Sequence, residues 1–355
     1  MVMAGGTGGH VFPALAVADY LRDHGESVVW MGTRNGIESR LVPQAGYPIE
    51  WLEVSGLRGK GKLTLLGAPF KLLIACWQAA RILLSNRPRA VLGMGGFAAG
   101  PGGLMAWLMR IPLVIHEQNA IAGLTNRLLK PLARRAYFAF PQATQPDTSS
   151  NIVGNPVRAD IAEIPSPDER LKNRAEQRMR LLVIGGSLGA RALNSMLPEA
   201  LALIAEEQRP SVRHQCGAAH LAACLALYKE HGVAAEVLPF VEDMAEAYHW
   251  ADLVICRAGA MTVSELAAAG MASILVPYPY AVDDHQYFNA QFLASANAAR
   301  VVRESELRPE ELANWLQDYA SNRKQLLEMS RQARSVARTD AAQRVAQGII
   351  QEASA

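Results

Sequence analysis

The sequence predicts an α/β protein of two domains, each built on a parallel sheet. Its 355 residues exceed what a single compact core usually serves. Short apolar runs alternate with helix-length segments along the whole chain, which is typical of βαβ units whose sheets are covered on both faces. A glycine-rich turn also follows the first apolar run of each half, at residues 5–9 and 185–189.

Each half supplies a set of short buried-strand candidates. In the first half they are residues 1–3, 27–31, 90–94, 113–115 and 136–140. In the second half they are residues 180–184, 212–216, 235–238, 253–256 and 273–276. Residues 141–173 are rich in Pro, Ser, Asp and Asn, so they read as a surface connection. We therefore expect domains at 1–157 and 158–335, with the last helical stretch broken near 337–340 and residues of about 336–355 returning to the first domain.

Composition excludes several classes of protein. Half of the residues are hydrophobic and 19% are charged, as in a globular chain, and a net charge of +2 does not suggest a nucleic-acid partner. The four cysteines show no metal-ligand spacing, so we expect reduced core thiols. The sequence shows no D-x-D motif for a metal, and we expect neither a metal site nor a cofactor. We expect a cytoplasmic protein because no signal-peptide pattern opens the chain. The uncharged stretch 90–109 contains six glycines and a proline, which argues against a membrane-spanning helix.

The glycine turns are candidates for holding an anion. In residues 4–10, Ala-Gly-Gly-Thr-Gly-Gly-His, a strand gives way to a helix whose free N–H groups and positive dipole end suit a phosphate. Residues 185–190 repeat the arrangement, and Ser187 adds a hydroxyl; residues 95–103 form a third turn. A dinucleotide site requires G-x-G-x-x-G and an acidic residue at the end of the next strand, and neither is present.

Two further helix starts follow strands in the second half. Residues 257–265, Arg-Ala-Gly-Ala-Met-Thr-Val-Ser-Glu, could hold a diphosphate at the helix start and ribose hydroxyls at Glu265. The alternative is a capping box between Thr262 and Glu265. A helix that carries Gln286 and Asn289 on one face would point two amides at a sugar, and a polar helix start is the alternative there.

Together these motifs resemble the MurG family of bacterial glycosyltransferases, which attach N-acetylglucosamine to lipid I. The motifs that carry the resemblance are residues 5–10, 55–60, 93–103, 116–119, 154–158, 185–190 and 257–265, so it spans nearly the whole chain. It implies the GT-B fold, with two Rossmann-like domains facing a cleft, and an inverting mechanism without a metal. The first domain would bind acceptor and membrane, and the second would bind UDP-N-acetylglucosamine.

The resemblance also assigns a donor site. Its residues would be Thr7, Gly8, Gly9, Asn119, Arg158, Ser187, Val241, Ala260, Met261, Thr262, Val263, Ser264, Glu265 and Gln286. Ser187 and the helix start at 260–262 would bind the diphosphate, Glu265 the ribose, and Val241 the uracil edge, while Arg257 would balance charge nearby. Some members have two glutamines where this chain has His285 and Gln286, so only the second of these sugar contacts is kept, at Gln286.

Inverting transfer needs a base for the acceptor hydroxyl and stabilisation of the leaving diphosphate. His10 is the candidate base, because it lies at a glycine turn and an imidazole titrates near pH 6.5. A capping or acceptor-binding role is its alternative. Glu117 is a second candidate base, and a structural role for it is equally compatible with the sequence.

The polyprenyl acceptor implies contact with a membrane surface. Residues 63–84 are largely apolar, with basic residues around them, which favours binding to anionic lipid on the cytoplasmic face of the inner membrane. The apolar set is Leu65, Leu66, Pro69, Phe70, Leu72, Leu73, Ile74 and Trp77, and the basic set is Arg58, Lys60, Lys62, Lys71, Arg81 and Arg87. Burial in the helix layer is the alternative, and both can hold for one helix. Other proteins of cell-wall synthesis are further partners that the resemblance implies.

Three rival functions share parts of this pattern. A UDP-N-acetylglucosamine 2-epimerase would share fold and donor but would have no use for the apolar basic segment. A lipid glucosyltransferase would differ at His285 and Gln286. A membrane-recruiting subunit without activity would need only the first domain, whereas this chain carries both.

Overall fold

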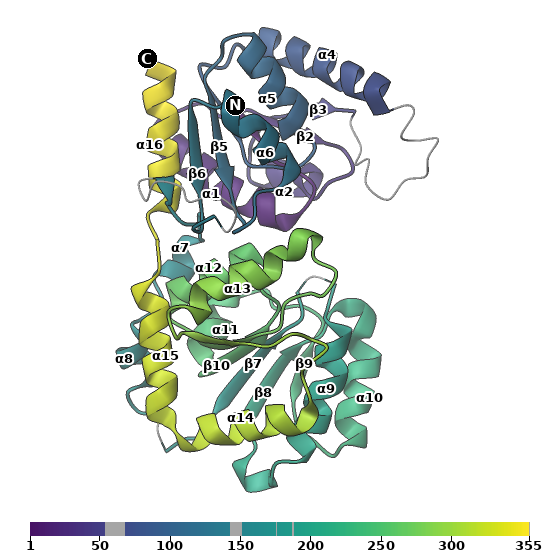
Figure 1. Ribbon diagram of the computed structural model, residues 1–355, viewed down its shortest axis with the longest axis vertical. Helices are drawn as coiled ribbons and strands as arrows, with labels where there is room; N and C mark the ends of the chain where they lie inside the picture. The colour runs from purple at the N-terminus through teal and green to yellow at the C-terminus, as the bar shows by residue number, and fades with distance from the viewer. Residues whose placement is uncertain (54–67, 143–150, 175, 187, 355) are drawn as a thin grey trace. The chain divides into compact units, whose positions relative to one another are not determined.

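The computed structural model describes residues 1–53, 68–142, 151–174, 176–186 and 188–354. They form two compact units (Figure 1). The first comprises Met1–Val157 together with Thr339–Ala355, and the second comprises Arg158–Arg338.

The first unit contains a parallel six-stranded sheet with the order β3-β2-β1-β4-β5-β6. Its strands are β1 Val2–Met3, β2 Trp30–Thr33, β3 Ile49–Leu52, β4 Val91–Gly93, β5 Leu113–Glu117 and β6 Arg135–Phe138. Its helices are α1 Gly8–Asp23, α2 Glu38–Gln44, α4 Ala68–Asn86, α5 Ala99–Leu108, α6 Leu124–Leu129 and α16 Ala341–Ser354. A strand order that begins at the centre and proceeds to either side places every crossover helix on a face of the sheet.

Both faces of this sheet are buried, as the alternation of side chains along a strand requires. Val2 packs with α1 and α16 in one hydrophobic core, whereas its neighbour Met3 packs with Ala79 and Leu83 of α4 in another. The last helix therefore completes the core of the unit in which the chain began. The break expected at residues 337–340 lies between α15, Arg323–Ser335, and α16.

The second unit contains a parallel sheet with the order β12-β11-β10-β7-β8-β9. Its strands are β7 Arg180–Ile184, β8 Ser211–Gln215, β9 Glu236–Leu238, β10 Leu253–Cys256, β11 Ala272–Leu275 and β12 Ala299–Val301. Besides α15, its helices are α7 Ala159–Ala162, α8 Pro167–Leu171, α9 Arg191–Ala202, α10 Leu221–Glu230, α11 Met244–Trp250, α12 Ala260–Ala269, α13 His285–Ala294 and α14 Pro309–Ser321.

The predicted strands are confirmed, most of them with ends shifted by one to three residues. The strands at 180–184 and 253–256 match β7 and β10 residue for residue. Two edge strands escaped prediction, β3 and β12, because their half-buried sequences Ile-Glu-Trp-Leu and Ala-Arg-Val lack a continuous apolar run. Apolar runs are typical of central strands, which are buried on both faces.

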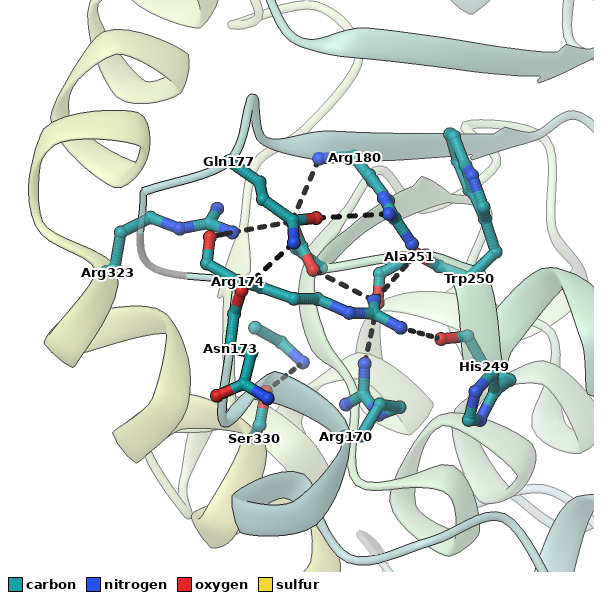
Figure 2. A network of polar contacts seen from close by, with 12 residues as sticks. Arg170, Asn173, Arg174, Gln177, Arg180, His249, Trp250, Ala251, Arg323 and Ser330 are labelled. Carbon is teal, nitrogen blue, oxygen red and sulfur yellow. Dashed lines mark hydrogen bonds and ion pairs between the residues drawn. The ribbon is translucent and has the colours of Figure 1, made fainter.

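A buried polar network fixes the amino ends of β7 and β10 (Figure 2). Arg174 donates to Asp252 Oδ1 at 3.1 Å and to the carbonyl oxygen of Trp250 at 2.8 Å, and Arg323 donates to Asp252 Oδ2 at 2.6 Å. Arg170 donates to the carbonyl oxygens of Ala251 and Gly270, which end α11 and α12. The guanidinium of Arg170 thus meets the negative dipole ends of two helices, which offsets part of the cost of burying it.

Within the described residues, no helix is both long and apolar enough to cross a bilayer.

Candidate functional site

The first glycine turn is held by a buried carboxylate. Glu38, at the start of α2, is fully buried and accepts hydrogen bonds from the N–H of Gly6 at 2.9 Å and from the N–H and hydroxyl of Thr33 at 3.0 and 2.7 Å. Gly6 has φ of 92°, a conformation that disfavours side chains. Three donors stabilise the carboxylate in this position and fix the path of the turn into α1.

His10 lies in the first turn of α1, where the first and third glycine turns meet. Its Nδ1 is 3.3 Å from the hydroxyl of Thr7, and a Cβ on Gly95 would touch its ring. Gly96 has φ of 82°, and a Cβ there would collide with the carbonyl oxygen of Gly5. The glycines after β4 therefore let this loop close against the loop after β1, which brings His10 and Thr7 to the carboxyl edge of the sheet.

Glu117 organises the loop after β5. Only 2% of the residue is exposed, and its carboxylate accepts from the N–H groups of Asn119 and Gly123 at 2.9 and 3.0 Å. It also accepts from the side-chain amides of Asn126 at 2.9 Å and Asn119 at 3.3 Å. Nearby, burial lowers the pKa of His116 to about 4, so its neutral ring donates from Nε2 to the carbonyl oxygen of Gly154. The hydrogen bonds to the Glu117 carboxylate therefore fix the conformation of the loop that carries Asn119.

The second glycine turn is held by a buried amide. Gln215, the last residue of β8, accepts from the N–H of Gly186 at 3.0 Å and donates from Nε2 to the carbonyl oxygen of the same residue at 2.9 Å. Gly186 has φ of 81°. Ser187, the predicted diphosphate ligand in this turn, lies outside the described residues, as does the motif at residues 55–60.

Helix α12 begins at Ala260, after an extended Gly259 that serves as N-cap without a side-chain hydrogen bond. The capping-box interpretation of Thr262 and Glu265 is therefore wrong, because Thr262 is the third helical residue. The first-turn amides of a helix have no partner within the helix, and they carry its positive dipole end. Val263 is further inside, and its N–H donates to the carbonyl oxygen of Gly259.

Glu265 lies one turn further along α12, between Tyr248 and Arg158. The Tyr248 hydroxyl donates to Glu265 Oε2 at 3.2 Å, and Arg158 Nη2 is 3.9 Å from Oε1. Burial raises the pKa of Glu265 to about 7, and the Arg158 charge and the Tyr248 hydrogen bond oppose that rise. Additional hydrogen-bond donors would stabilise the ionised form of this buried carboxylate. Two vicinal hydroxyls of a ligand could supply such donors.

Three other predicted residues of the second unit differ in their surroundings. Gln286 Oε1 accepts from the N–H groups of Ala258 and Tyr278, so its Nε2 is the end that can donate to a sugar. The prediction that Asn289 points at a sugar is wrong, because Asn289 is fully buried and donates to the carbonyl oxygen of Ala258. The guanidinium of Arg257 donates hydrogen bonds to the carboxylate of Glu304 and to the carbonyl oxygens of Val276 and Pro277.

The described candidate residues divide between the two units. The first unit holds Thr7, Gly8, Gly9, His10, Glu117 and Asn119, in the turn after β1, the first turn of α1, the end of β5 and the loop after it. The second holds Arg158, Val241, Ala260, Met261, Thr262, Val263, Ser264, Glu265 and Gln286, from α7, the segment after β9, α12 and α13. In the part of the chain that the structure describes, no group of His, Cys, Asp or Glu side chains has the arrangement of a metal site.

Sequence reasoning missed three residues that hold this site, namely Glu38, Gln215 and Tyr248. Glu38 and Tyr248 lie in helices, and nothing in their local sequence marks them. Gln215 carried a signal: it is a polar residue at the carboxyl end of a predicted parallel strand, which is the edge of a sheet where ligands bind.

Comparison with known proteins shows the family. Residues 1–138 match the glycosyltransferase family 28 N-terminal domain, and residues 180–345 match the corresponding C-terminal domain. Two curated relatives are named UDP-N-acetylglucosamine–N-acetylmuramyl-(pentapeptide) pyrophosphoryl-undecaprenol N-acetylglucosamine transferase. The protein of Marinobacter nauticus is 54% identical over all of this chain and 97% of its own length. The protein of Nitrosococcus oceani is 53% identical over all of this chain and 98% of its own length.

Solved structures agree with this result. MurG of Acinetobacter baumannii superimposes with a TM-score of 0.87 at 43% identity, covering 99% of both chains. The glycotransferase of kitacinnamycin superimposes with a TM-score of 0.69 at 16% identity, covering 99% of this chain and 98% of its own, which shows a shared fold. The two six-stranded parallel sheets are those of an α/β GT-B fold. The chain therefore belongs to the MurG family of glycosyltransferases.

Proposed function

We propose that this chain transfers N-acetylglucosamine from UDP-N-acetylglucosamine to the C4 hydroxyl of the muramyl sugar of lipid I, which gives lipid II for peptidoglycan synthesis. The observation that carries the proposal is the full-length similarity, at 53–54% identity, to curated transferases of that name. In the reaction, the acceptor oxygen forms a bond to C1 of the sugar with inversion, the bond from C1 to the β-phosphate oxygen breaks, and UDP leaves.

The donor is assigned to the second unit. The first-turn amides of α12, at Ala260, Met261 and Thr262, suit the diphosphate, because they lie at the positive end of a helix dipole. Glu265 suits the ribose, since two hydroxyl donors would satisfy a buried carboxylate. Gln286 suits a sugar hydroxyl through its Nε2, and Arg158 keeps a positive charge beside Glu265. As charge grows on the leaving diphosphate, the helix amides stabilise it.

His10 is assigned as the base that takes the proton of the acceptor hydroxyl. It lies at the carboxyl edge of the first sheet beside the hydroxyl of Thr7, and it is half-buried rather than enclosed. Glu117 is the alternative base. Its four accepted hydrogen bonds favour a positioning role, because proton transfer to this carboxylate would disturb the loop it holds.

The test of the function is transfer of radiolabelled sugar to a lipid I analogue, with and without EDTA. We expect a lipid II product in both cases, formed from UDP-N-acetylglucosamine and not from UDP-glucose. Formation of UDP-N-acetylmannosamine, or of free N-acetylmannosamine and UDP by added hydrolysis, would identify an epimerase. Transfer of glucose to diacylglycerol would identify a lipid glucosyltransferase. A product that EDTA abolished would contradict the metal-free mechanism.

We also assign α4 to the surface of an anionic membrane, on the cytoplasmic face of the inner membrane. One side of α4 is buried through Ala75, Ala79 and Leu83. The opposite side leaves large apolar side chains in solvent, with Phe70 at 70%, Leu73 at 68% and Trp77 at 60% exposure.

Basic side chains lie along the same helix. Lys71 and Arg81 are exposed, and the guanidinium of Arg81 lies 4.9 Å from the ring centroid of Trp77. An exposed apolar surface with cations beside it is the combination that binds anionic lipid, and α5, which packs on α4, adds exposed Trp107 and Leu108. Residues 54–67 lie outside the described residues; they include Arg58, Lys60 and Lys62 of the basic set and Leu65 and Leu66 of the apolar set.

Flotation with vesicles that contain anionic phospholipid tests this assignment. Leu73→Ser and Lys71→Glu should each reduce binding, and Leu225→Ser, at an exposed leucine of α10 in the second unit, serves as the matched control. Binding that survived both changes, or charge reversal at Lys60, Lys62 and Lys71 together, would contradict the assignment. Other proteins of cell-wall synthesis remain proposed partners, for which lipid-free pull-down with purified candidates is the test.

A further inference from the structure

The second glycine turn and the segment before Val241 are joined by one side chain. Gln215 Nε2 donates to the carbonyl oxygen of Gly186 at 2.9 Å and to the carbonyl oxygen of Pro239 at 3.2 Å, while its Oε1 accepts from the N–H of Gly186 at 3.0 Å. The backbone of Gln215 also pairs with this turn, because its carbonyl oxygen accepts from the N–H of Gly185 at 3.0 Å. Only 3% of Gln215 is exposed.

Only a side-chain amide satisfies these partners. The N–H of Gly186 requires an acceptor, and the two carbonyl oxygens require donors, so the orientation of the amide is fixed by its surroundings. A glutamate would set a carboxylate against two carbonyl oxygens, and an apolar residue would leave one N–H and two carbonyl oxygens without this partner in a buried place.

In the first unit a buried side chain also accepts from the glycine turn, but that side chain is a carboxylate and not an amide. There the N–H of the second glycine, Gly6, is taken by the carboxylate of Glu38, whereas in the second unit the N–H of Gly186 is taken by the neutral Gln215. Both glycines have a positive φ, of 92° and 81°. An anion placed at the first turn would face a buried carboxylate, and an anion at the second turn would not.

We infer that Gln215 is the positioning residue that holds the diphosphate turn and the uracil-facing segment of the donor site in one geometry, and that its lack of charge reserves the second turn for the diphosphate. The inference rests on the proposed function, because it takes UDP-N-acetylglucosamine as the ligand of the second unit. Gln215 acts through the backbone of Gly186 and Pro239, and both hydrogens of its side-chain amide are used there.

The test compares Gln215→Met and Gln215→Glu in the full-length protein, with UDP and uridine binding measured by calorimetry and transfer kinetics measured alongside. Both variants should weaken UDP by about tenfold or more, because both lose the two hydrogen bonds that Nε2 donates to the carbonyl oxygens of Gly186 and Pro239. Gln215→Glu should weaken UDP further than Gln215→Met does, and this additional loss should be larger for UDP than for uridine, because the added charge repels the phosphates. With saturating donor, kcat and the acceptor KM should stay within about twofold of wild type, since an effect confined to the donor appears in its KM.

Arg174→Met is the matched control. Arg174 is a polar residue of the same unit that also binds backbone carbonyl oxygens, but at the amino ends of the strands (Figure 2). It should lower Tm and leave the affinity for UDP unchanged. If the Gln215 variants lowered Tm to a similar extent and bound UDP as the wild type does, the inference would be overturned. Equal losses in kcat, acceptor KM and donor KM would also overturn it, since they indicate general misfolding.

Measurements on the wild-type protein distinguish a failure of the proposed function from a failure of the inference on Gln215. A wild type that neither bound UDP nor transferred sugar would overturn the proposed function, and with it the role of Gln215. A wild type that did both, beside Gln215 variants with unchanged UDP affinity, would overturn the inference alone. Should Gln215→Glu fail to fold, Gln215→Met still tests positioning.

Discussion

The raised pKa of Glu265 makes donor binding depend on pH near neutrality. If ribose hydroxyls bind the ionised carboxylate, only that form is competent, and the apparent affinity falls with its fraction. With a pKa of about 7, that fraction is roughly 0.9 at pH 8 and 0.1 at pH 6. We therefore expect UDP-N-acetylglucosamine to bind about tenfold more weakly at pH 6 than at pH 8.

Binding should also release protons. At pH 7 about half of the protein molecules carry a proton on Glu265, so about half a proton should leave for each ligand bound. Calorimetry in buffers of different ionisation enthalpy measures this number. UDP-N-acetylglucosamine is the ligand of choice, because its diphosphate has no terminal phosphate that titrates near neutrality.

The partner of Glu265 provides a second perturbation. Tyr248→Phe removes a hydrogen bond that lowers the pKa of Glu265. A hydrogen bond to a charged group contributes about 1.5 kcal/mol or more, so its loss should raise the pKa of Glu265 further, by roughly one unit. The loss of affinity should then begin at a higher pH than in wild type.

Tyr228→Phe is the matched control, since Tyr228 is a buried tyrosine of the same unit whose hydroxyl pairs with His214 instead. Its pH profile should match that of wild type. Buffer-independent binding heats at pH 7 would refute the reasoning, and so would equal affinities at pH 6 and pH 8. In the absence of ligand, the raised pKa means that folded Glu265 binds more protons than unfolded Glu265, so the contribution of Glu265 to stability should fall as the pH rises from about 4.5 to about 7. The lowered pKa of His116 contributes with the opposite sign, so the effect is read as the difference between wild type and Glu265→Gln.

The remaining predictions concern the first unit and the buried network. His10→Ala should lower kcat by about 10²-fold or more with little change in donor affinity, and a near-normal kcat would contradict its role as base. Glu117→Gln should lower the free energy of unfolding by roughly 1–3 kcal/mol, measured in urea, because one acceptor oxygen becomes a donor; a large loss of kcat at unchanged stability would instead point to a base. Asp252→Asn should lower Tm, since it leaves Arg174 and Arg323 short of their buried counter-charge, and an unchanged Tm would contradict the assigned importance of that network.

The sequence was most informative where local pattern and tertiary environment coincide. The strands at 180–184 and 253–256 were predicted without error, because strands buried on both faces are nearly continuous apolar runs, as in Leu181–Ile184 and Leu253–Cys256. The glycine turns were visible for a similar reason, since a positive φ at Gly6 and Gly186 restricts the residue type directly. Parallel strands align their carboxyl ends, so the candidate loops could be placed at one edge of each sheet.

Side-chain function depended on facts that the local sequence does not contain. Asn289 and Gln286 lie three residues apart on α13, yet their roles differ. Asn289 is buried and donates to the carbonyl oxygen of Ala258, whereas Gln286 accepts through Oε1 and keeps its Nε2 for a ligand. Glu117 read equally well as a base or a structural residue until its four hydrogen bonds were visible.

The sequence by itself determined the alternation of strands and helices, the glycine turns and the family to which the motifs belong. Only the tertiary structure decided which polar groups hold the turns, because that depends on which strand lies beside which. Gln215 reaches Gly186 because β8 pairs with β7 across 29 residues of chain, and Glu38 reaches Gly6 across 32. Buried polar groups must find hydrogen-bond partners, and the order of the strands in the sheet determines which partners are within reach.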